Sequence, residues 1–439
     1  MQVLVAGGGP VGTYTAIALA RHGHVVTVVD RDPGPGADGE WQRKGVMQGT
    51  HPHGWRPGVR RALLAEMPDV YQEILAAGAR EQRPPGVPDA MAAMATGYFC
   101  RRPVVERVLR AAAQRQPGLT WLTGHVDDVV VEDGVARGLV VDGDRLDADA
   151  VVVATGRVSH LGERLRGRVE GGPCGSAYIF RQYRAREAEW ACDLTVPSFS
   201  TGPGYVSLVM PQDDATHSVL VAYPVDAPEF AALRTADGFA LMTQAIPNLA
   251  PWTDPERYEP VTEVTVGGNL TNTYQLQGPA LGMPPARGLY FVGDAILTTN
   301  PAAGRNLSLL LGHVQHLLAT LDTVDDPDSV SLALDEWAEQ HVRPWFEDHV
   351  RWDRTLLRRF AGQDLDLDER IPSDVICAAV EVDRSILPNV MMYLGMAAGP
   401  DVLDPVEDTV RTLLRDGWRP RTDGPTSAQL AALVSAVPA

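Results

Sequence analysis

The sequence predicts an α/β protein with a parallel sheet, a separate antiparallel sheet and a C-terminal helical region. A strand–turn–helix–strand pattern opens the chain, and a second strand–turn–helix pattern follows near residue 290. Between 178 and 266 the apolar residues alternate as in antiparallel strands. The segment 332–415 has helical periodicity. We therefore expect a discontinuous first domain (1–170 with 280–325), an antiparallel-sheet domain (171–279) and a helical region (326–439).

Composition excludes several classes of protein. The 439 residues are 45% hydrophobic and 21% charged, as in globular enzymes. A formal net charge of −18 argues against nucleic acid as a partner, because phosphate binding needs clustered basic residues. The four cysteines form no C-x-x-C pair, and no apolar run reaches the roughly 18 residues of a membrane span. We expect no disulfide, no metal site, no membrane span, no signal peptide and a cytoplasmic location.

The first motif is a glycine-rich turn between a strand and a helix. The strand at 3–6 runs into Gly7, Gly9 and Gly12, which occupy the three positions of G-x-G-x-x-G. In such a turn the first glycine allows a tight bend, the second admits a pyrophosphate, and the third lets helix and strand pack closely. The next strand ends at Asp30, where an acid can accept a hydrogen bond from a ribose hydroxyl.

This arrangement predicts a Rossmann-type dinucleotide site, because the helix N-terminus offers free N–H groups and a positive dipole end to phosphates. We include the neighbouring residues Pro10, Val11 and Arg31 in the predicted site.

The second motif lies about 280 residues later. A strand runs into Gly293-Asp294, a turn follows with Pro301 and Gly304, and an apolar-faced helix spans 305–321. Two strand–turn–helix segments so far apart indicate one cofactor held by distant parts of the chain.

Together these motifs resemble the flavoprotein monooxygenases of the para-hydroxybenzoate hydroxylase fold, over about the first 325 residues. The resemblance implies FAD as cofactor, with Asp294 near the ribityl chain or pyrophosphate and the turn Pro301–Gly304 aimed at the flavin ring. It also implies contacts to FAD from three other segments: Arg43 before Gly45-Val46, Arg102 at the start of an R-P-x-x-E segment, and the strand Trp121–Val131, which touches adenine near Val126. A further buried strand ends at Thr155-Gly156, under the cofactor.

Two departures from the family pattern bear on mechanism. The family's D-G-x-x-S segment, which helps bind FAD and NADPH, is here Thr155-Gly156-Arg157-Val158-Ser159 and lacks the acid. This favours reduced flavin from a separate reductase over direct use of NAD(P)H, although NADPH can bind this fold without a motif of its own. In the later turn, Asn306 replaces a glycine and Ser308 an asparagine. Arg305 points at the flavin or substrate, or is solvated at a helix start.

The implied chemistry is transfer of one oxygen atom from a flavin C4a-hydroperoxide to a small hydrophobic metabolite, by hydroxylation or epoxidation, in bacterial secondary metabolism. The alternatives are an FAD dehydrogenase or reductase without oxygen insertion, and a halogenase, which would need a lysine; Lys44 lies in the predicted FAD-contact segment. No catalytic residue is assigned. His51 and His53 are either surface residues, an acid/base or substrate contact, or metal ligands, and their spacing matches no H-E-x-x-H pair.

Overall fold

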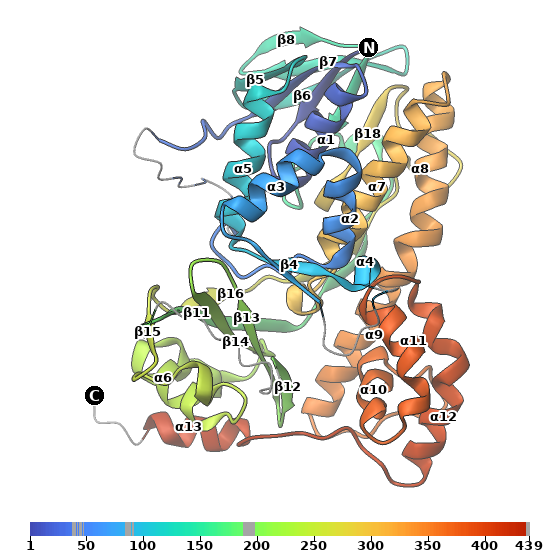
Figure 1. The fold of residues 1–439 in the computed structure, drawn as a ribbon. Coiled ribbons are helices and arrows are strands. Elements are labelled where there is room, and N and C mark those ends of the chain that lie inside the picture. The colour runs from blue at the N-terminus through green and yellow to red at the C-terminus, as the bar shows by residue number, and fades with distance from the viewer. Residues whose placement is uncertain are drawn as a thin grey trace. The chain divides into compact units, whose positions relative to one another are not determined.

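The computed structural model describes residues 1–36, 41, 43, 46, 48–83, 89, 92–187 and 198–435; Lys44 and Gly45 lie outside them. The chain divides into two compact units (Figure 1). Unit 1 comprises Met1–His51, Trp55–Gly172 and Asn272–Phe346, and unit 2 comprises Pro52–Gly54, Pro173–Thr271 and Glu347–Ala439. This division is coarser than the three predicted domains, whose boundaries stay a prediction.

The centre of unit 1 is a parallel sheet with the strand order β18-β9-β1-β2-β5. Residues 3–6 and 150–153, in the two neighbouring strands β1 and β9, are short runs of valine, leucine and alanine that are buried almost completely, as is typical of a parallel sheet covered on both faces. The strands are β1 (Gln2–Ala6), β2 (Val25–Asp30), β5 (Leu119–Thr123), β9 (Ala150–Val153) and β18 (Leu289–Phe291). The predicted α/β fold with a parallel sheet is confirmed.

Helices pack around this sheet in unit 1. Helix α1 (Pro10–Arg21) begins at Pro10, where the missing N–H of proline costs no hydrogen bond. It packs against α5 (Arg102–Arg115) and α7 (Asn306–Leu321), and the three helices can be followed in Figure 1. The remaining helices of unit 1 are α2 (Pro57–Glu66), α3 (Pro68–Ala76), α4 (Ala92–Ala95) and α8 (Pro327–His341), with α2 and α8 both against α7.

One sequence prediction about strands is wrong. The expected single strand Trp121–Val131 is two strands, because β5 ends at Thr123 and β6 begins at Val126. At Gly124 the chain leaves the parallel sheet, and its N–H donates to the carbonyl of Asp30. Strand β6 (Val126–Glu132) then forms an antiparallel meander with β7 (Val135–Val141) and β8 (Asp144–Asp147). Five shorter strands are also described: β3 (Arg80–Gln82), β4 (Gly97–Phe99), β10 (Glu170–Pro173), β17 (Thr271–Tyr274) and β19 (Leu297–Thr298).

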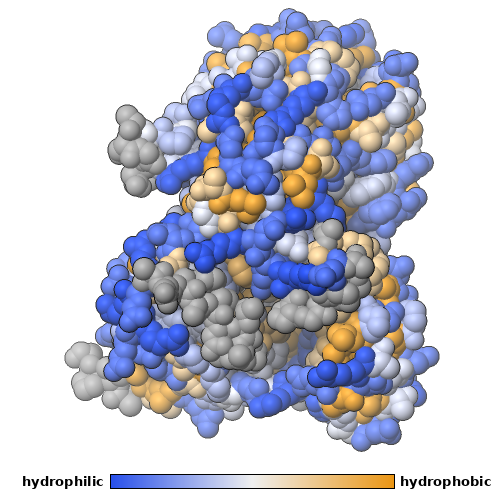
Figure 2. Space-filling model, viewed as in Figure 1, coloured by the Kyte–Doolittle hydropathy of each residue, from blue (hydrophilic) through white to orange (hydrophobic). Residues whose placement is uncertain are grey.

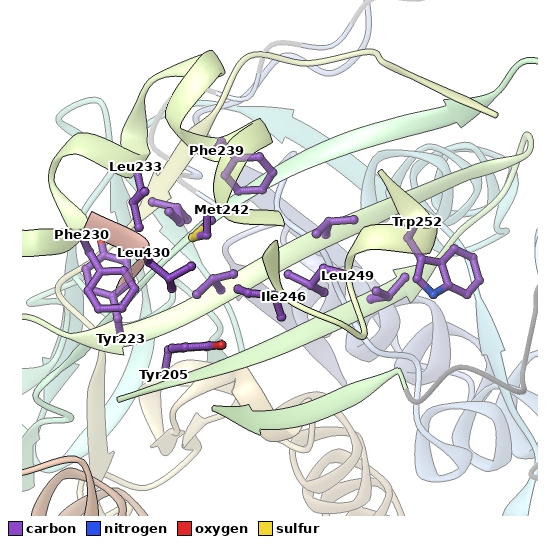
Figure 3. Close-up of a cluster of buried hydrophobic side chains, with 14 of the residues drawn as sticks. Tyr205, Tyr223, Phe230, Leu233, Phe239, Met242, Ile246, Leu249, Trp252 and Leu430 are labelled. Carbon is purple, nitrogen blue, oxygen red and sulfur yellow. The ribbon is translucent and has the colours of Figure 1, made fainter. Parts of the chain in front are cut away.

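Unit 2 contains the predicted antiparallel sheet, with the order β12-β13-β14-β11-β15 and β16 paired to β11. Its strands are β11 (Ser176–Ala185), β12 (Phe199–Gly202), β13 (Tyr205–Pro211), β14 (Thr216–Pro224), β15 (Tyr258–Pro260) and β16 (Thr265–Gly267). In Figure 3, Phe239 and Met242 of α6 (Ala236–Ala245) pack on one face of this sheet. Leu430 of α13 (Ser427–Ser435) inserts beside Phe230 in the same core.

The C-terminal helical region is also confirmed. It consists of α9 (Arg343–Phe360), α10 (Ser373–Ala378), α11 (Leu387–Leu394) and α12 (Asp404–Arg415). Buried Asp348 ties three of these helices together, because it accepts hydrogen bonds from the hydroxyls of Tyr393 (2.5 Å) and Ser373 (3.1 Å).

The visible face of each unit is mostly hydrophilic in Figure 2, as the net charge of −18 leads one to expect. In the described part of the chain, no helix is both long and apolar enough to cross a membrane. The same residues contain no cluster of His, Cys, Asp or Glu that could hold a metal ion.

His217 makes the stability of unit 2 depend on pH. Its ring is fully buried, stacks on Tyr183 and donates a hydrogen bond from Nε2 to the Trp252 carbonyl oxygen, 2.7 Å away. Burial lowers the pKa of His217 to about 4, against an ordinary value of 6.5. The unfolded chain therefore binds this proton more tightly than the folded chain. Stability that is present above pH 6.5 is lost as the pH falls towards 4.

We expect His217→Gln to be less stable than the wild type at pH 8, because the ring packing is lost. The free-energy difference between the two proteins should shrink by about 2 to 3 kcal/mol at pH 4.5, since glutamine has no proton to take up. Urea unfolding of both proteins at the two pH values measures this. A difference that does not change with pH would contradict the assignment.

Candidate dinucleotide-binding site

Three segments far apart in the sequence meet at the carboxyl edge of the parallel sheet. Strand β9 lies between β1 and β18, with Val153 paired to both Ala6 and Phe291. The next residues along each strand are therefore neighbours: the glycine-rich turn at Gly7, the pair Thr155-Gly156, and Gly293-Asp294. The structure thus brings together the motifs that the sequence predicted to share a cofactor.

Two glycines of the first turn are required by the protein's own packing. Gly7 has φ +102°, and a Cβ there would lie 2.5 Å from the Ala154 carbonyl oxygen. A Cβ on Gly12 would lie 2.0 Å from the Gly7 carbonyl oxygen and 3.1 Å from the Ala154 side chain. Helix α1 and strand β1 therefore approach each other only because residue 12 lacks a side chain.

Gly9 differs from these two glycines, because a Cβ there would meet no described atom within 4 Å. It is the N-cap of α1 and has extended backbone angles that any residue can adopt. No side chain caps α1, and its first turn carries no acid. The turn therefore presents open backbone and free N–H groups, the arrangement that binds phosphate oxygens.

Asp30 ends β2 beside this turn, as predicted. Its carboxylate accepts hydrogen bonds from the backbone N–H groups of Gly8 and of Asp32 (2.7 Å for the latter). Each carboxylate oxygen has a second lone-pair site, so a ribose hydroxyl can still donate to Asp30. The adjacent Arg31 is exposed.

Arg43 reaches the same place but binds acids of the chain itself. Its guanidinium donates to Glu106 (2.5 Å) and Asp32 (3.1 Å) and lies 3.4 Å from the Gly8 carbonyl oxygen. Arg102, the first residue of α5, pairs with the same Glu106. The sequence placed both arginines near the cofactor, but the acids that hold them were not predicted.

Asp294 lies in a 3-10 helix, Gly293–Ala295, at the end of β18. The Asn306 side-chain amide donates to Asp294 (3.0 Å) and to the Leu297 carbonyl (3.2 Å). Burial raises the pKa of Asp294, while Arg102, Arg157 and the amide act in the opposite direction. Asn306 thus replaces the family's glycine with a side chain that orients the acid.

The turn before α7 forms as predicted, although Asn306 replaces the second glycine of the family pattern. Asn300 accepts a hydrogen bond from the Ala302 N–H (3.1 Å), and Gly304 takes the left-handed conformation with φ +61° and ψ 28°. Pro301 begins this 3-10 turn. Arg305 is only 1% exposed, and its guanidinium lies 4.8 Å from the Trp345 ring. The alternative in which Arg305 is solvated at the start of the helix is therefore wrong.

The remaining predicted residues lie as follows. The hydroxyl of Thr155 is buried and meets no hydrogen-bond partner among the described residues. Gly156 has φ +81° and open space at its Cβ position. Val126 starts β6 and pairs with Val141, outside the parallel sheet. Burial and the charges of Arg102 and Arg157 lower the pKa of His51 to about 4, so its ring is neutral at pH 7.

Sequence reasoning missed Arg166, which binds the backbone at Ala295, directly after Gly293-Asp294, and in the loop before β18. Its guanidinium donates to three backbone carbonyls, those of Gln275 (2.9 Å), Leu276 (2.8 Å) and Ala295 (2.7 Å). It also lies 4.0 Å from the centroid of the Phe291 ring. Burial lowers the pKa of Arg166 to about 9, so it stays charged at pH 7.

A second group, Asp335 and Gln277, supports the same strand. The Gln277 side chain makes two hydrogen bonds with the backbone of Phe291 (2.7 and 2.9 Å). Asp335 accepts from the Gln277 N–H (2.7 Å), and burial raises its pKa to about 6. These residues tie β18 to the loop 275–278 just before Asp294.

We expect Arg166→Met to lower the free energy of unfolding by about 3 kcal/mol or more, because three carbonyls lose a charged donor. Urea unfolding measures the loss. Arg287→Met, which removes an exposed arginine paired to Asp328, should cost less than about 1 kcal/mol. Equal losses in the two variants would show that the Arg166 contacts contribute little.

Comparisons with known proteins agree with this geometry. A family model described as pyridine nucleotide-disulphide oxidoreductase matches residues 1–185. The D-amino acid dehydrogenase of Rhodopseudomonas palustris (strain HaA2) is 44% identical over 65 residues. That match covers 15% of this chain and only 15% of the relative's length.

Two solved structures are similar over most of the chain. The flavin-dependent brominase Bmp2 has a TM-score of 0.67 at 14% identity, covering 95% of this chain and 99% of its own. PqsL of Pseudomonas aeruginosa, described as a probable FAD-dependent monooxygenase, has a TM-score of 0.60 at 18% identity, covering 82% and 98%. The shared fold, together with the family-model match over residues 1–185, confirms the predicted resemblance to flavoproteins of the para-hydroxybenzoate hydroxylase fold.

Proposed function

We propose that the protein is an FAD-dependent monooxygenase, which transfers one oxygen atom from O2 to a small hydrophobic organic molecule by hydroxylation or epoxidation. The observation that carries the proposal is the meeting of the glycine-rich turn, Thr155-Gly156 and Gly293-Asp294 at one sheet edge. Two turns that each start a helix can hold the two ends of one extended dinucleotide.

The residues at this edge fit FAD. The open backbone at Gly9 and the uncapped start of α1 suit a pyrophosphate, and no described residue forms a hydrogen bond with the buried Thr155 hydroxyl. We assign cofactor binding to Gly7, Gly9, Pro10, Val11, Gly12, Asp30, Arg31, Arg43, Arg102, Val126, Thr155, Gly156, Gly293, Asp294, Pro301, Gly304, Arg305 and Asn306. Within this set, Arg305 acts through packing on Trp345, because its side chain is buried.

When bound and reduced, FAD supplies the activation of O2, so that one oxygen atom enters the substrate and the other leaves as water. The chain's own residues bind, orient and exclude water. The N-terminal ends of α1 and α7 favour negative charge, and Asn306 orients the Asp294 carboxylate. No catalytic acid or base is assigned.

The two faces of the antiparallel sheet in unit 2 each pack a buried apolar cluster. One face of its sheet carries a buried cluster of Cys174, Tyr178, Phe180, Leu220 and Leu270, opposite the face that packs on α6. Side chains alternate between the two faces along β11, so Tyr178 and Phe180 point away from α6 while Ile179 points towards it. We propose that the antiparallel-sheet part of the chain, 171–279, binds the substrate.

Two other reaction classes compete with oxygen insertion. The name of the dehydrogenase relative favours oxidation without oxygen insertion, and the brominase favours halogenation. A halogenase of the lysine-dependent kind would have to use Lys44, because the antiparallel sheet and the C-terminal helices contain no lysine.

The test loads the protein with FAD, reduces it without oxygen, and mixes it with 18O2 and a panel of aromatic and alkene compounds. One 18O atom per product molecule, detected by mass spectrometry, supports a monooxygenase. Turnover with an artificial electron acceptor under argon supports a dehydrogenase, and a strict need for chloride or bromide supports a halogenase. Either of these last results, without 18O in the product, contradicts the proposal.

We further propose that a separate reductase supplies the reduced flavin, because Thr155 stands where the family's acid would be. Stopped-flow mixing of the FAD-loaded protein with NADH or NADPH, without oxygen and with candidate substrates, tests this. Loss of the visible flavin band at a rate compatible with turnover contradicts it. Product formation only after a flavin reductase is added supports it.

A further inference from the structure

The last part of the chain leaves the C-terminal helices and ends on the antiparallel sheet of unit 2. Helix α12 ends at Arg415, most of residues 415–422 are exposed, and α13 then packs against α6. Figure 1 shows this path as the red ribbon that runs from α12 to α13. We call residues 416–435 the C-terminal strap.

One side chain anchors helix α13 on the sheet. Leu430 is fully buried in the cluster that contains Phe230, whereas Leu433 of the same helix is 42% exposed. A capping box starts the helix: the Gln429 side chain accepts from the Thr426 N–H (2.8 Å), and the Thr426 hydroxyl accepts from the Gln429 N–H (3.2 Å). A helix of nine residues is only marginally stable in water by itself. The docking of Leu430 therefore keeps α13 helical.

Ahead of α13, the strap holds the outer edge of the antiparallel sheet. Strand β12 is the edge strand and pairs with β13. The Asp423 N–H donates to the carbonyl of Thr201 in β12 (3.0 Å). Gly424 has φ +100°, and a Cβ there would lie 2.5 Å from the hydroxyl oxygen of Tyr205, the first residue of β13. The strap thus contacts both strands of the β12–β13 hairpin and covers part of an edge whose backbone groups would otherwise be open.

We propose that the C-terminal strap is a releasable restraint on the β12–β13 hairpin: α13 undocks as a unit while the rest of the protein stays folded, and its release frees the edge of the antiparallel sheet. A single buried side chain anchors α13, whereas β14 is paired along its length to both β13 and β11. A segment held by so few buried contacts opens at a lower free energy than the whole protein.

The device bears on function through the sheet that it restrains. The proposed function assigns substrate binding to residues 171–279, and the strap then controls how freely the edge of this substrate-binding sheet moves. This consequence rests on the proposed function. The undocking of α13 and the freeing of the hairpin do not, because both follow from the contacts of the strap alone.

Hydrogen exchange of the full-length protein, followed by mass spectrometry of its peptides, tests the proposal. In the wild type we expect the amides of 427–435 to exchange at least about a hundredfold faster than those of β14. Leu430→Ala should speed exchange of 427–435 by about tenfold or more and should also speed exchange of 199–205, while β14 stays within about twofold of the wild type. Leu433→Ala, which changes the exposed leucine of the same helix, is the matched control and should alter none of these rates.

Exchange of 427–435 at the rate of β14 in the wild type would overturn the proposal, because the strap would then open only when the whole protein unfolds. Faster exchange of α13 in Leu430→Ala without any change at 199–205 would overturn it as well, since the strap would not restrain the hairpin. If Leu430→Ala does not fold, the wild type in low concentrations of urea decides. The exchange rate of α13 must then depend less steeply on urea than that of β14, because local opening exposes less surface than global unfolding. An equal dependence overturns the proposal. These measurements need no flavin, so their failure is distinct from failure of the proposed function.

Discussion

Replacing Gly12 with valine should abolish FAD binding. The Cβ alone would lie 2.0 Å from the Gly7 carbonyl oxygen, and the rest of the side chain would separate α1 from β1. The glycine-rich turn would open and α1 would no longer direct its N–H groups at the pyrophosphate. We expect no change in flavin fluorescence on titration with FAD, and a free energy of unfolding lower by at least about 3 kcal/mol, as for severe overpacking.

A second helical glycine provides the control for this substitution. Gly312 in α7 has room for a methyl group, since its Cβ would lie 3.4 Å from the nearest atom of Trp337. Gly312→Ala should therefore bind FAD normally, whereas Gly12→Ala should already fail. If Gly12→Val binds FAD like the wild type, the turn is only a structural feature and the cofactor lies elsewhere.

The parts of the site that the sequence predicted are those built from short local patterns. The turn Gly7–Gly12 lies between two strands within one crossover, and Gly293-Asp294 directly follows a buried strand, so each could be recognised from its immediate neighbours. The erroneous strand Trp121–Val131 shows the limit of this reasoning. Its valines suit a strand throughout, and only the departure of the chain at Gly124 assigns the two halves to different sheets.

The parts that were missed depend on contacts between residues far apart in the sequence. Arg166 donates to a carbonyl 129 positions later, and Asp335 accepts from the Gln277 N–H, 58 positions earlier. The chain contains many arginines, and nothing near Arg166 in the sequence separates it from those on the surface. Arg305 was given two roles for the same reason, because the ring that covers it, Trp345, belongs to a later helix.

Replacing Gly9 with valine should weaken FAD binding by about a hundredfold while the protein stays folded. Unlike Gly12, Gly9 has extended backbone angles and no described atom within 4 Å of its Cβ position, so the fold tolerates a side chain there. The expected cost to stability is about 1 kcal/mol, from a poorer N-cap. A bound pyrophosphate would have to approach this same backbone, and a loss of about 3 kcal/mol of binding corresponds to the hundredfold change.

Titration with FAD and thermal unfolding of the same preparation separate the two effects. Gly23→Val is the control: Gly23 also has open space at its Cβ but lies at the other end of α1, so it should lose stability, because its φ is +87°, and still bind FAD. Gly9→Val is thus expected to lose mainly affinity for FAD, and Gly23→Val is expected to lose only stability. Wild-type affinity in a folded Gly9→Val would mean that no phosphate approaches this turn. The uncapped start of α1 would then need another explanation.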